Sequence, residues 1–490
     1  MTLPAWNELT VHEALARLEQ GDLTSQELVT TLLGVIRERD QQIQGYLEVD
    51  EADALRQAAA ADQLRKQGHK GQLLGIPLAI KDVLNVQGQS CRCASHILEG
   101  YRAPYDATAV ERLRAEGALF VGRANMDEFA MGSTTENSAF QVTRNPWDLQ
   151  RVPGGSSGGS AAVVAADEAL AALGSDTGGS VRLPAAFCGC VGLKPTYGRI
   201  SRYGLTAFAS SLDQIGPLTK DIRDAALLLQ VMAGHDERDA TSSPQPVPDY
   251  AAALRKDLAG IKLGLPREYF IAGMDAEVEQ IVQQAIRQCE QLGAAISEVS
   301  LPLTAFAVAT YYIIACAEAS ANLARFDGVR YGQRVKDAID PLDMYTRSRA
   351  AGFGTEVKRR IILGTYVLSS GYYEAYYCRA QKVRARLRAD FVKAFQQCDA
   401  LLTPVAPTAA FRLGEKTADP LQMYLSDIFT VAVNLSGVCA LSVPCGFTSA
   451  GLPVGLQVVG PAFGEETILR VGYAYEQSTP WLERKPGRFL

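Results

Sequence analysis

Apolar residues recur at helical spacing in the first 65 residues of the chain. The pattern Thr-x-x-Glu occurs at 10–13 and again at 24–27, and it is typical of a residue pair that caps a helix start. An alanine-rich helix is expected at 51–66. We therefore predict a helical lead-in, and its clearest amphipathic stripe consists of Leu28, Val29, Leu32, Leu33 and Ile36.

The pattern changes to short apolar runs from about residue 73. GIPLAIKD (75–82) is an apolar run bounded by glycine and charge, which predicts a buried strand, and a helix at 106–117 and a strand at 118–122 follow. This alternation predicts an α/β fold built in layers. Further strands are expected at 259–265, 294–301, 399–404, 438–446 and 453–460, and helices at 161–172, 223–233, 275–292, 355–394 and 465–476.

Composition and charge exclude several classes of protein. Of the 490 residues, 47% are hydrophobic and 21% are charged, which is ordinary for a globular chain and excludes a disordered, collagen-like or disulfide-scaffold protein. The net charge of −6 argues against a chain that holds nucleic acid mainly by itself. The N-terminus lacks the order of a signal peptide, and no apolar run approaches the length of a membrane span, so we expect a cytoplasmic protein.

Ten cysteines are present, with two close pairs at Cys91/Cys93 and Cys188/Cys190. Neither pair has C-x-x-C spacing, and no cluster of histidines completes a tetrahedral zinc site. We therefore expect buried, reduced thiols and predict no metal site in this chain.

Two loops rich in glycine and serine carry the candidate chemistry, at 153–160 (PGGSSGGS) and 174–189. Neither has the Lys-Ser or Lys-Thr that a phosphate-binding loop needs after its glycines, so we do not expect nucleotide binding. Ser180 follows Gly178 and Gly179, which leave its hydroxyl uncrowded, so that successive N–H groups can point into one small volume. This is the arrangement of a serine nucleophile beside an oxyanion hole.

A serine nucleophile needs a base, and the sequence offers two kinds. The four histidines are His12, His69, His96 and His235. Residues 154–158 match G-x-S-x-G, but only His235 follows, so a Ser-His-Asp triad is disfavoured, although His96 could reach the site from another loop. Lys81 ends the apolar run at 75–82, where burial would lower its pKa and leave a neutral amine; the alternative is an ion pair with Asp82.

Together, GIPLAIKD, GGSSGGS and SDTGGSVRLPAAFCGCVGLKPTYGRIS resemble the amidase signature family in order and in spacing. The resemblance implies an α/β amidase-signature fold, with a central mixed β-sheet covered by helices on both faces. It also implies one domain over 1–490, in which 1–66 is the lead-in, 73–235 holds the signature core, and 251–490 completes the sheet and the substrate pocket.

The same resemblance implies roles for individual residues. Ser180 matches the nucleophile, Ser156 the bridging serine that follows a cis peptide, and Lys81 the base. The backbone N–H groups of Thr177, Gly178, Gly179 and Ser180 match the oxyanion hole.

Three later segments, at 317–332, 353–373 and 427–446, resemble the amidotransferase branch of this family. That resemblance implies a subunit that hydrolyses glutamine and supplies ammonia for converting Glu-tRNA(Gln) to Gln-tRNA(Gln). It further implies a heterotrimer with amidotransferase subunits B and C, in which B holds the tRNA and uses ATP and Mg²⁺, and no cofactor in this chain. A stand-alone amidase that acts on other carboxamides is the alternative, and a non-catalytic scaffold is a second one.

By the same resemblance, Arg360 binds the carboxylate of glutamine, Asp427 binds its ammonium group, and Tyr311 closes the pocket. Arg359 remains an alternative to Arg360, and Asp427 could instead cap a helix. The basic segment 378–390 could contact nucleic acid, but such a run is more often a solvated helix face. Arg92 and His96 depart from the residues expected in this branch.

Overall fold

The computed structural model describes residues 5–271 and 273–487, and one mixed sheet forms its centre. Within the described residues, eleven strands lie in the order β1-β3-β2-β4-β6-β5-β10-β11-β9-β7-β8. The strands are β1 (Tyr46–Val49), β2 (Pro77–Lys81), β3 (Leu119–Ala124), β4 (Ala171–Asp176), β5 (Val191–Lys194), β6 (Gln214–Thr219), β7 (Lys262–Pro266), β8 (Ala295–Val299), β9 (Ala400–Pro404), β10 (Ala440–Phe447) and β11 (Pro453–Val459).

Parallel and antiparallel pairs share this sheet. β2 lies parallel to both β3 and β4, so Lys81 and Asp176 end neighbouring strands at the same edge. β5, β10, β11 and β9 pair antiparallel, which joins the two halves of the chain in one sheet. The division of the chain into domains stays a prediction.

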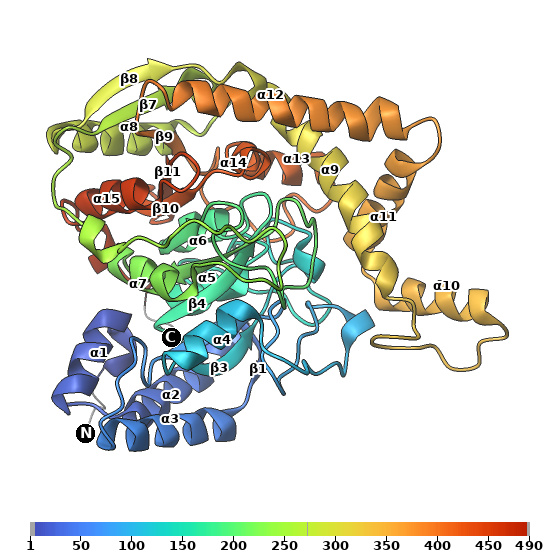
Figure 1. Cartoon of the computed structure of the whole chain (residues 1–490), viewed down its shortest axis with the longest axis horizontal. Coiled ribbons are helices and arrows are strands. Elements are labelled where there is room, and N and C mark those ends of the chain that lie inside the picture. Colours follow the sequence, from blue (N-terminus) through green and yellow to red (C-terminus); the bar gives the residue numbers. More distant parts are fainter. Residues whose placement is uncertain (1–4, 272, 488–490) are drawn as a thin grey trace.

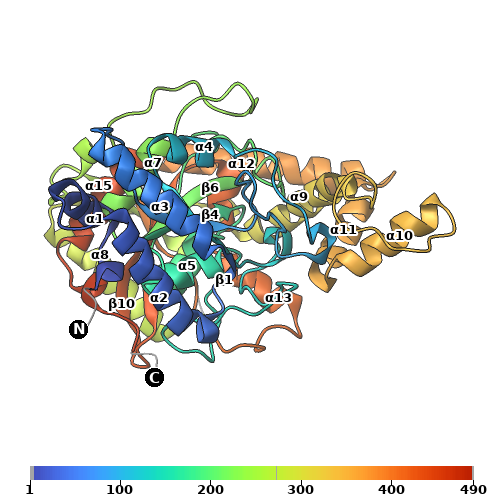
Figure 2. The same cartoon turned by 90° about the horizontal axis from the view of Figure 1, so that it is seen from below.

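Helices cover both faces of the sheet (Figure 1, Figure 2). The helices are α1 (Val11–Gln20), α2 (Ser25–Ile43), α3 (Glu51–Lys66), α4 (Thr108–Ala115), α5 (Gly158–Ala165), α6 (Arg182–Cys188), α7 (Ile222–Met232), α8 (Ala276–Gln291), α9 (Ala307–Asn322), α10 (Pro341–Gly352), α11 (Thr355–Leu368), α12 (Arg379–Ala394), α13 (Pro420–Tyr424), α14 (Val431–Ser436) and α15 (Glu465–Glu476). A π-helix, η8 (Tyr373–Cys378), precedes α12.

Two apolar layers lie on the two faces of the sheet, and the strands contribute side chains to both. Along β2, Leu78 and Ile80 enter the larger core, whereas Ala79 between them enters the second one. Successive side chains of a strand point to opposite faces, so a strand covered on both sides has apolar residues at every position. This explains why 75–82 is a continuous apolar run, and the predicted strand there is confirmed.

Most of the predicted elements are present. Both capping boxes form, with Thr10 and Thr24 each accepting the N–H of the glutamate three residues later. The helices expected at 51–66 and 465–476 have those bounds. All ten cysteines are free, and nine of them are buried, as expected.

Three expectations about elements are wrong. The helix expected at 161–172 ends at Ala165, and the next apolar stretch is β4, because burial in the sheet overrides the helix propensity of its alanines. The helical lead-in contains the short strand β1, which pairs with β3. The helix expected at 355–394 breaks after Leu368, where Gly371 has a φ of +82°.

One segment contradicts the expectation that no apolar run reaches membrane-spanning length. Pro302–Arg325 has 24 residues, and an 18-residue stretch within it has a mean hydropathy of 1.4, enough to span a membrane by length and composition alone. Its helix α9 packs against α11, α12 and α14. A core helix of a globular protein has the same properties, and these contacts identify α9 as such a helix.

Candidate active site

Lys81 lies fully buried at the end of β2, with its amine among three serine hydroxyls. Its Nζ is 2.8 Å from Ser156 Oγ, 2.8 Å from Ser157 Oγ and 2.9 Å from Ser175 Oγ. Burial lowers the pKa of Lys81 to about 7, although nearby carboxylates of Asp127, Asp176 and Asp213 act in the opposite direction. The amine is therefore in part neutral at physiological pH and able to accept a proton.

The alternative interpretation of Lys81, an ion pair with Asp82, is wrong. Asp82 turns away and accepts Arg123 Nε at 3.4 Å and the backbone N–H groups of Arg92 and Ala94. Arg92, one of the departures noted in the sequence, thus supports the carboxylate that neighbours Lys81 in the chain.

Ser156 lies in a loop whose neighbouring glycines have no room for a larger side chain. The Gly155–Ser156 peptide bond is cis, as the resemblance implied. A Cβ at Gly155 would lie 2.1 Å from Asp127 Oδ2, and one at Gly158 would lie 2.1 Å from Thr135 Oγ1. Asp127 in turn accepts the N–H of Thr135 at 2.9 Å. The glycines of 153–160 therefore allow close packing around the serine.

Ser180 lies in the turn between β4 and α6, and a buried carboxylate holds this turn from inside. Asp176 accepts the N–H of Gly179 at 2.9 Å and of Val181 at 3.1 Å. The N–H of Ser157 donates to the carbonyl oxygen of Ser180 at 3.1 Å, so the two serine-bearing loops are joined directly. Burial opposes the ionisation of Asp176, but the ion pair with Arg182 overcomes it and holds the pKa of Asp176 below its ordinary value.

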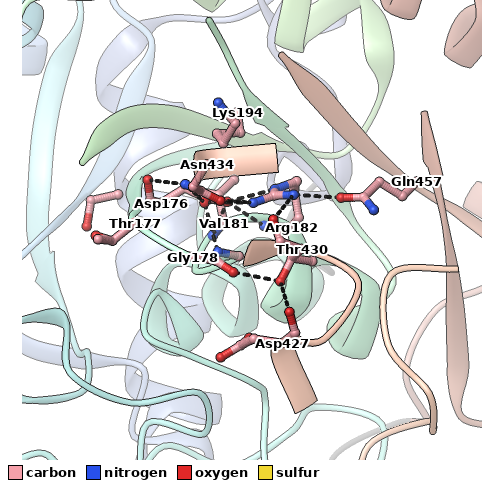
Figure 3. A network of polar contacts seen from close by, with 12 residues as sticks. Asp176, Thr177, Gly178, Val181, Arg182, Lys194, Asp427, Thr430, Asn434 and Gln457 are labelled. Atoms are coloured by element: carbon pink, nitrogen blue, oxygen red, sulfur yellow. Dashed lines mark hydrogen bonds and ion pairs between the residues drawn. The ribbon is translucent and has the colours of Figure 1, made fainter. Parts of the chain in front are cut away.

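Arg182 anchors that carboxylate to the C-terminal part of the chain (Figure 3). The guanidinium is fully buried and contacts Asp176 at 3.0 Å, Gln457 Oε1 at 2.6 Å and Asn434 Oδ1 at 2.6 Å. Sequence reasoning missed this network. The available signal was a pair of opposite charges, Asp176 and Arg182, on either side of the Gly-Gly-Ser turn in an otherwise uncharged segment.

The backbone donors near Ser180 differ in one respect from the expectation. Gly179, expected in the oxyanion hole, has its N–H directed at Asp176. In the part of the chain that the structure describes, the N–H groups of Gly178 and Ser180 find no hydrogen-bond acceptor. Thr177, the fourth expected residue, donates its hydroxyl to Asp213 Oδ1 at 2.7 Å. The role of these donors stays a prediction.

Ser180 Oγ forms no hydrogen bond to any described residue, so the expected contact between Ser156 and Ser180 is not made here. The structure shows two contacts instead. Lys81 Nζ is hydrogen-bonded to Ser156 Oγ, and the backbone N–H of Ser157 is hydrogen-bonded to the carbonyl oxygen of Ser180. The complete relay stays a prediction.

The residues expected to bind substrate lie beside the Ser180 turn. A Cβ at Gly178 would lie 2.6 Å from the Tyr311 ring, and one at Gly179 would lie 3.3 Å from Asp427 Oδ1. Asp427 accepts Ser133 Oγ at 2.5 Å, and burial raises the pKa of Asp427 to about 7, although the nearby Arg360 charge opposes this. Both side chains therefore border the turn that carries the candidate nucleophile.

The two arginines in question lie in different environments. Arg360 is 2% exposed and donates to Glu356 Oε1 at 2.7 Å, with its guanidinium 5.2 Å from the Tyr312 ring centre. The Arg359 side chain is 40% exposed and pairs with Glu356 from the outside. A cavity of about 160 Å³ borders both arginines, Glu356, Lys416 and Tyr424. The position of Arg360 thus favours it over Arg359.

Asp427 caps no helix with its side chain. Thr430 donates its N–H to the main-chain oxygen of Asp427, while the Asp427 carboxylate binds Ser133. The alternative that Asp427 serves only as a helix cap is therefore wrong.

No histidine takes part in the site that the described residues form. His96 pairs with Glu99 at the surface, and His235 contacts the carbonyl oxygen of Ser242. His12 lies with Asp221 and Asp224, whose ligand atoms fall within 4.8 Å of one another. Asp224 already accepts the N–H groups of Val11 and His12, so the cap of α1 accounts for this grouping.

Comparison with known proteins agrees with the resemblance found in the sequence. The family model described as Amidase matches residues 27–469. The chain is 60% identical over 480 residues to the A subunit of the glutamyl-tRNA(Gln) amidotransferase of Methylacidiphilum infernorum, covering 98% of this chain and 96% of that protein. It is 57% identical to the protein of the same name from Geotalea daltonii, covering 98% and 99%.

Solved structures agree with these relatives. The crystal structure of the same A subunit from Thermotoga maritima has a TM-score of 0.81 and 44% identity, over 97% of this chain and 96% of that one. A bacterial aryl acylamidase of the amidase signature family has a TM-score of 0.86 and 25% identity, over 98% and 99%. The expected fold class is confirmed, and the chain belongs to the amidase family.

Proposed function

We propose that this chain is the glutamine-hydrolysing subunit of a glutamyl-tRNA(Gln) amidotransferase. The observation that carries the proposal is the fully buried amine of Lys81, 2.8 Å from Ser156 Oγ and without an ion-pair partner among the described residues. Relatives of 57% to 60% identity that are named as part of this enzyme, over nearly the whole chain, support the assignment.

In the first step, Ser180 Oγ attacks the side-chain carboxamide carbon of glutamine. Ser156 accepts the Ser180 proton while it passes its own hydroxyl proton to Lys81. The pKa of about 7 at Lys81 suits this step, because a base works best when it titrates near the operating pH. The N–H groups of Gly178 and Ser180 are the donors best placed for the developing oxyanion, each worth about 3 kcal/mol in comparable enzymes. Thr177 and Gly179 remain candidates for the same role.

In the second step, the C–N bond breaks and the proton held by Lys81 returns through Ser156 to the leaving nitrogen. Ammonia departs, and a glutamyl ester remains on Ser180. A water molecule then attacks the ester carbonyl and gives its proton to the same relay. Glutamate leaves as Ser180 recovers its proton, so the chain ends the cycle unchanged.

Recognition of glutamine falls to Arg360, Asp427 and Tyr311. A guanidinium binds both oxygens of an α-carboxylate, and Arg360 is the buried arginine beside the pocket. The ammonium group pairs with Asp427, whose burial has raised its pKa to about 7, so the arriving positive charge favours its ionised form. Tyr311 packs on Gly178 and closes the pocket over the reacting carbon.

Ammonia then passes to the partners of this chain, the amidotransferase subunits B and C, which complete a heterotrimer. The B partner holds Glu-tRNA(Gln) and uses ATP and Mg²⁺ to activate it. No cofactor belongs to this chain in the proposal. The net charge of −6 supports a division of labour in which a different polypeptide holds the tRNA. The role implies a cytoplasmic location, where aminoacyl-tRNA is made and used.

The test uses the reconstituted heterotrimer with Ser180→Ala and, as a matched control, Ser160→Ala, which removes a buried hydroxyl of α5 that donates to Leu173. We expect Ser180→Ala to abolish glutamine-dependent amidation of Glu-tRNA(Gln) but to keep ammonia-dependent amidation. Mass spectrometry of the wild-type chain mixed with glutamine should detect the ester on Ser180. Rapid hydrolysis of aryl amides with no turnover of glutamine would favour the stand-alone amidase.

A further inference from the structure

Exposed apolar side chains are concentrated in one part of the surface. Among the described residues, eleven of the eighteen exposed large apolar side chains lie between residues 329 and 376, which is about a tenth of the chain. In Figures 1 and 2, α10 and α11 in this segment project from one end of the molecule, beyond the sheet. A monomeric surface usually scatters such residues singly, so this concentration indicates contact with another molecule.

The helix α11 is apolar on two opposite sides. Its inner side packs on α9, and Gly364 permits a close approach, because a Cβ there would lie 1.9 Å from the carbonyl oxygen of Cys316. Its outer side carries Ile362, which is 69% exposed, together with Leu363 and Tyr366. A helix with apolar residues on opposite sides is normally covered on both.

The chain after α11 extends this outer side with aromatic rings. Tyr372 lies 4.4 Å from the Tyr366 ring centre, and Tyr376 lies 6.0 Å from Tyr372. We call Ile362, Leu363, Tyr366, Tyr372 and Tyr376 the tyrosine face. Tyrosine supplies a large contact area at low entropic cost and is enriched at the centre of protein interfaces.

Cations without ion-pair partners among the described residues follow the tyrosine face along the chain, in the first half of α12. Arg379, Lys382 and Arg386 are exposed, fall on one side of α12 at helical spacing, and form no ion pair in the described part of the chain. A surface that complements this region has an apolar centre and acidic residues at its rim.

We infer that the tyrosine face is the docking surface for a companion polypeptide of the assembly, one with acidic residues around an apolar patch. The inference rests on the proposed function for the existence of that assembly. A second copy of this chain fits poorly, because a two-fold contact would bring Arg379, Lys382 and Arg386 of both copies together. RNA fits poorly as well, because its phosphates offer nothing to the aliphatic side chains of Ile362 and Leu363.

The experiment measures binding of the purified full-length chain to the proposed B and C partners. We expect the double variant Ile362→Ser/Tyr366→Ser to weaken binding about 30-fold, the loss typical of removing central interface anchors. The charge reversal Lys382→Glu/Arg386→Glu should also weaken binding and flatten its dependence on salt. The control Leu55→Ser/Leu64→Ser changes side chains of α3 that are also exposed, and it should bind as the wild type does.

Glutamine hydrolysis by the free chain separates the two proposals. We expect kcat/KM of Ile362→Ser/Tyr366→Ser to stay within twofold of the wild type, which also shows that the variant is folded. Wild-type binding by both tyrosine-face variants would overturn the inference, as would loss of tRNA binding in these variants with binding of the B and C partners intact. If the wild-type chain binds these partners but does not hydrolyse glutamine, the proposed function fails and the docking surface stands.

Discussion

Replacing Arg182 by leucine tests whether the buried ion pair holds the Ser180 turn in place. The guanidinium donates to Asp176, Gln457, Asn434 and the carbonyl oxygen of Thr430, and both charged groups are fully buried. Arg182→Leu leaves the Asp176 carboxylate buried without its counter-charge. Breaking such a pair costs about 3–5 kcal/mol, and two side chains that lose their donor add about 1 kcal/mol or more each. We therefore expect the free energy of unfolding to fall by about 5–7 kcal/mol.

The measurement is chemical denaturation followed by circular dichroism, with Arg56→Leu as the control because its side chain is 69% exposed. The lowered pKa of Asp176 also predicts how stability changes with pH, which is a second measurement. Stability from this carboxylate is present above its ordinary pKa of 3.8 and is lost as the pH falls below that value. Arg182→Leu should remove that part of the acid sensitivity. A loss below 1 kcal/mol with unchanged glutaminase kinetics would refute the reasoning.

Three further predictions concern the site. The kcat/KM for glutamine should fall as the pH drops below about 7, because Lys81 becomes protonated there, and a flat profile between pH 6 and 8 would contradict this role of Lys81. Lys81→Met should remove activity at every pH. Arg360→Lys should raise the KM for glutamine at least tenfold with a smaller change in kcat, because the Arg360 guanidinium is buried at the pocket. Arg359→Lys should change neither parameter by more than about twofold, because the Arg359 side chain is 40% exposed. Gly178→Ala should lower kcat at least 100-fold, because its Cβ would lie 2.6 Å from the Tyr311 ring. Gly34→Ala is the control, because this helical glycine of α2 has open space around it, and equal losses in both variants would show a general loss of fold.

The sequence predicts the order of the layers better than the elements that form the site. β2 was predictable because a strand covered on both faces must be apolar at each position, and Lys81 followed from its place at the end of that strand. β4 was not, because its alanines and glycine have no strand signature, and only the pairing with β2 and β6 makes it a strand. The break after Leu368 depends on three residues, Ser369 to Gly371, which a long periodic pattern hides.

Long-range contacts set a second limit on what the sequence can predict. Nothing local relates Arg182 to Gln457, 275 positions later, so their hydrogen bond is invisible in the sequence. The same holds for Ser133 and Asp427, which are 294 positions apart. The choice between Lys81 as base and Lys81 as the partner of Asp82 also needed coordinates, because it depends on where Arg123 lies.

The dependence of the Ser180 turn on Gln457 in β11 bears on how the protein is made. Synthesis proceeds from the N-terminus, so a growing chain possesses Lys81, Ser156 and Ser180 long before the strand that secures their geometry leaves the ribosome. The hydrogen bonds that hold the Ser180 turn are therefore completed only when translation is nearly finished, and a polypeptide that ends before β11 lacks the contact between Arg182 and Gln457.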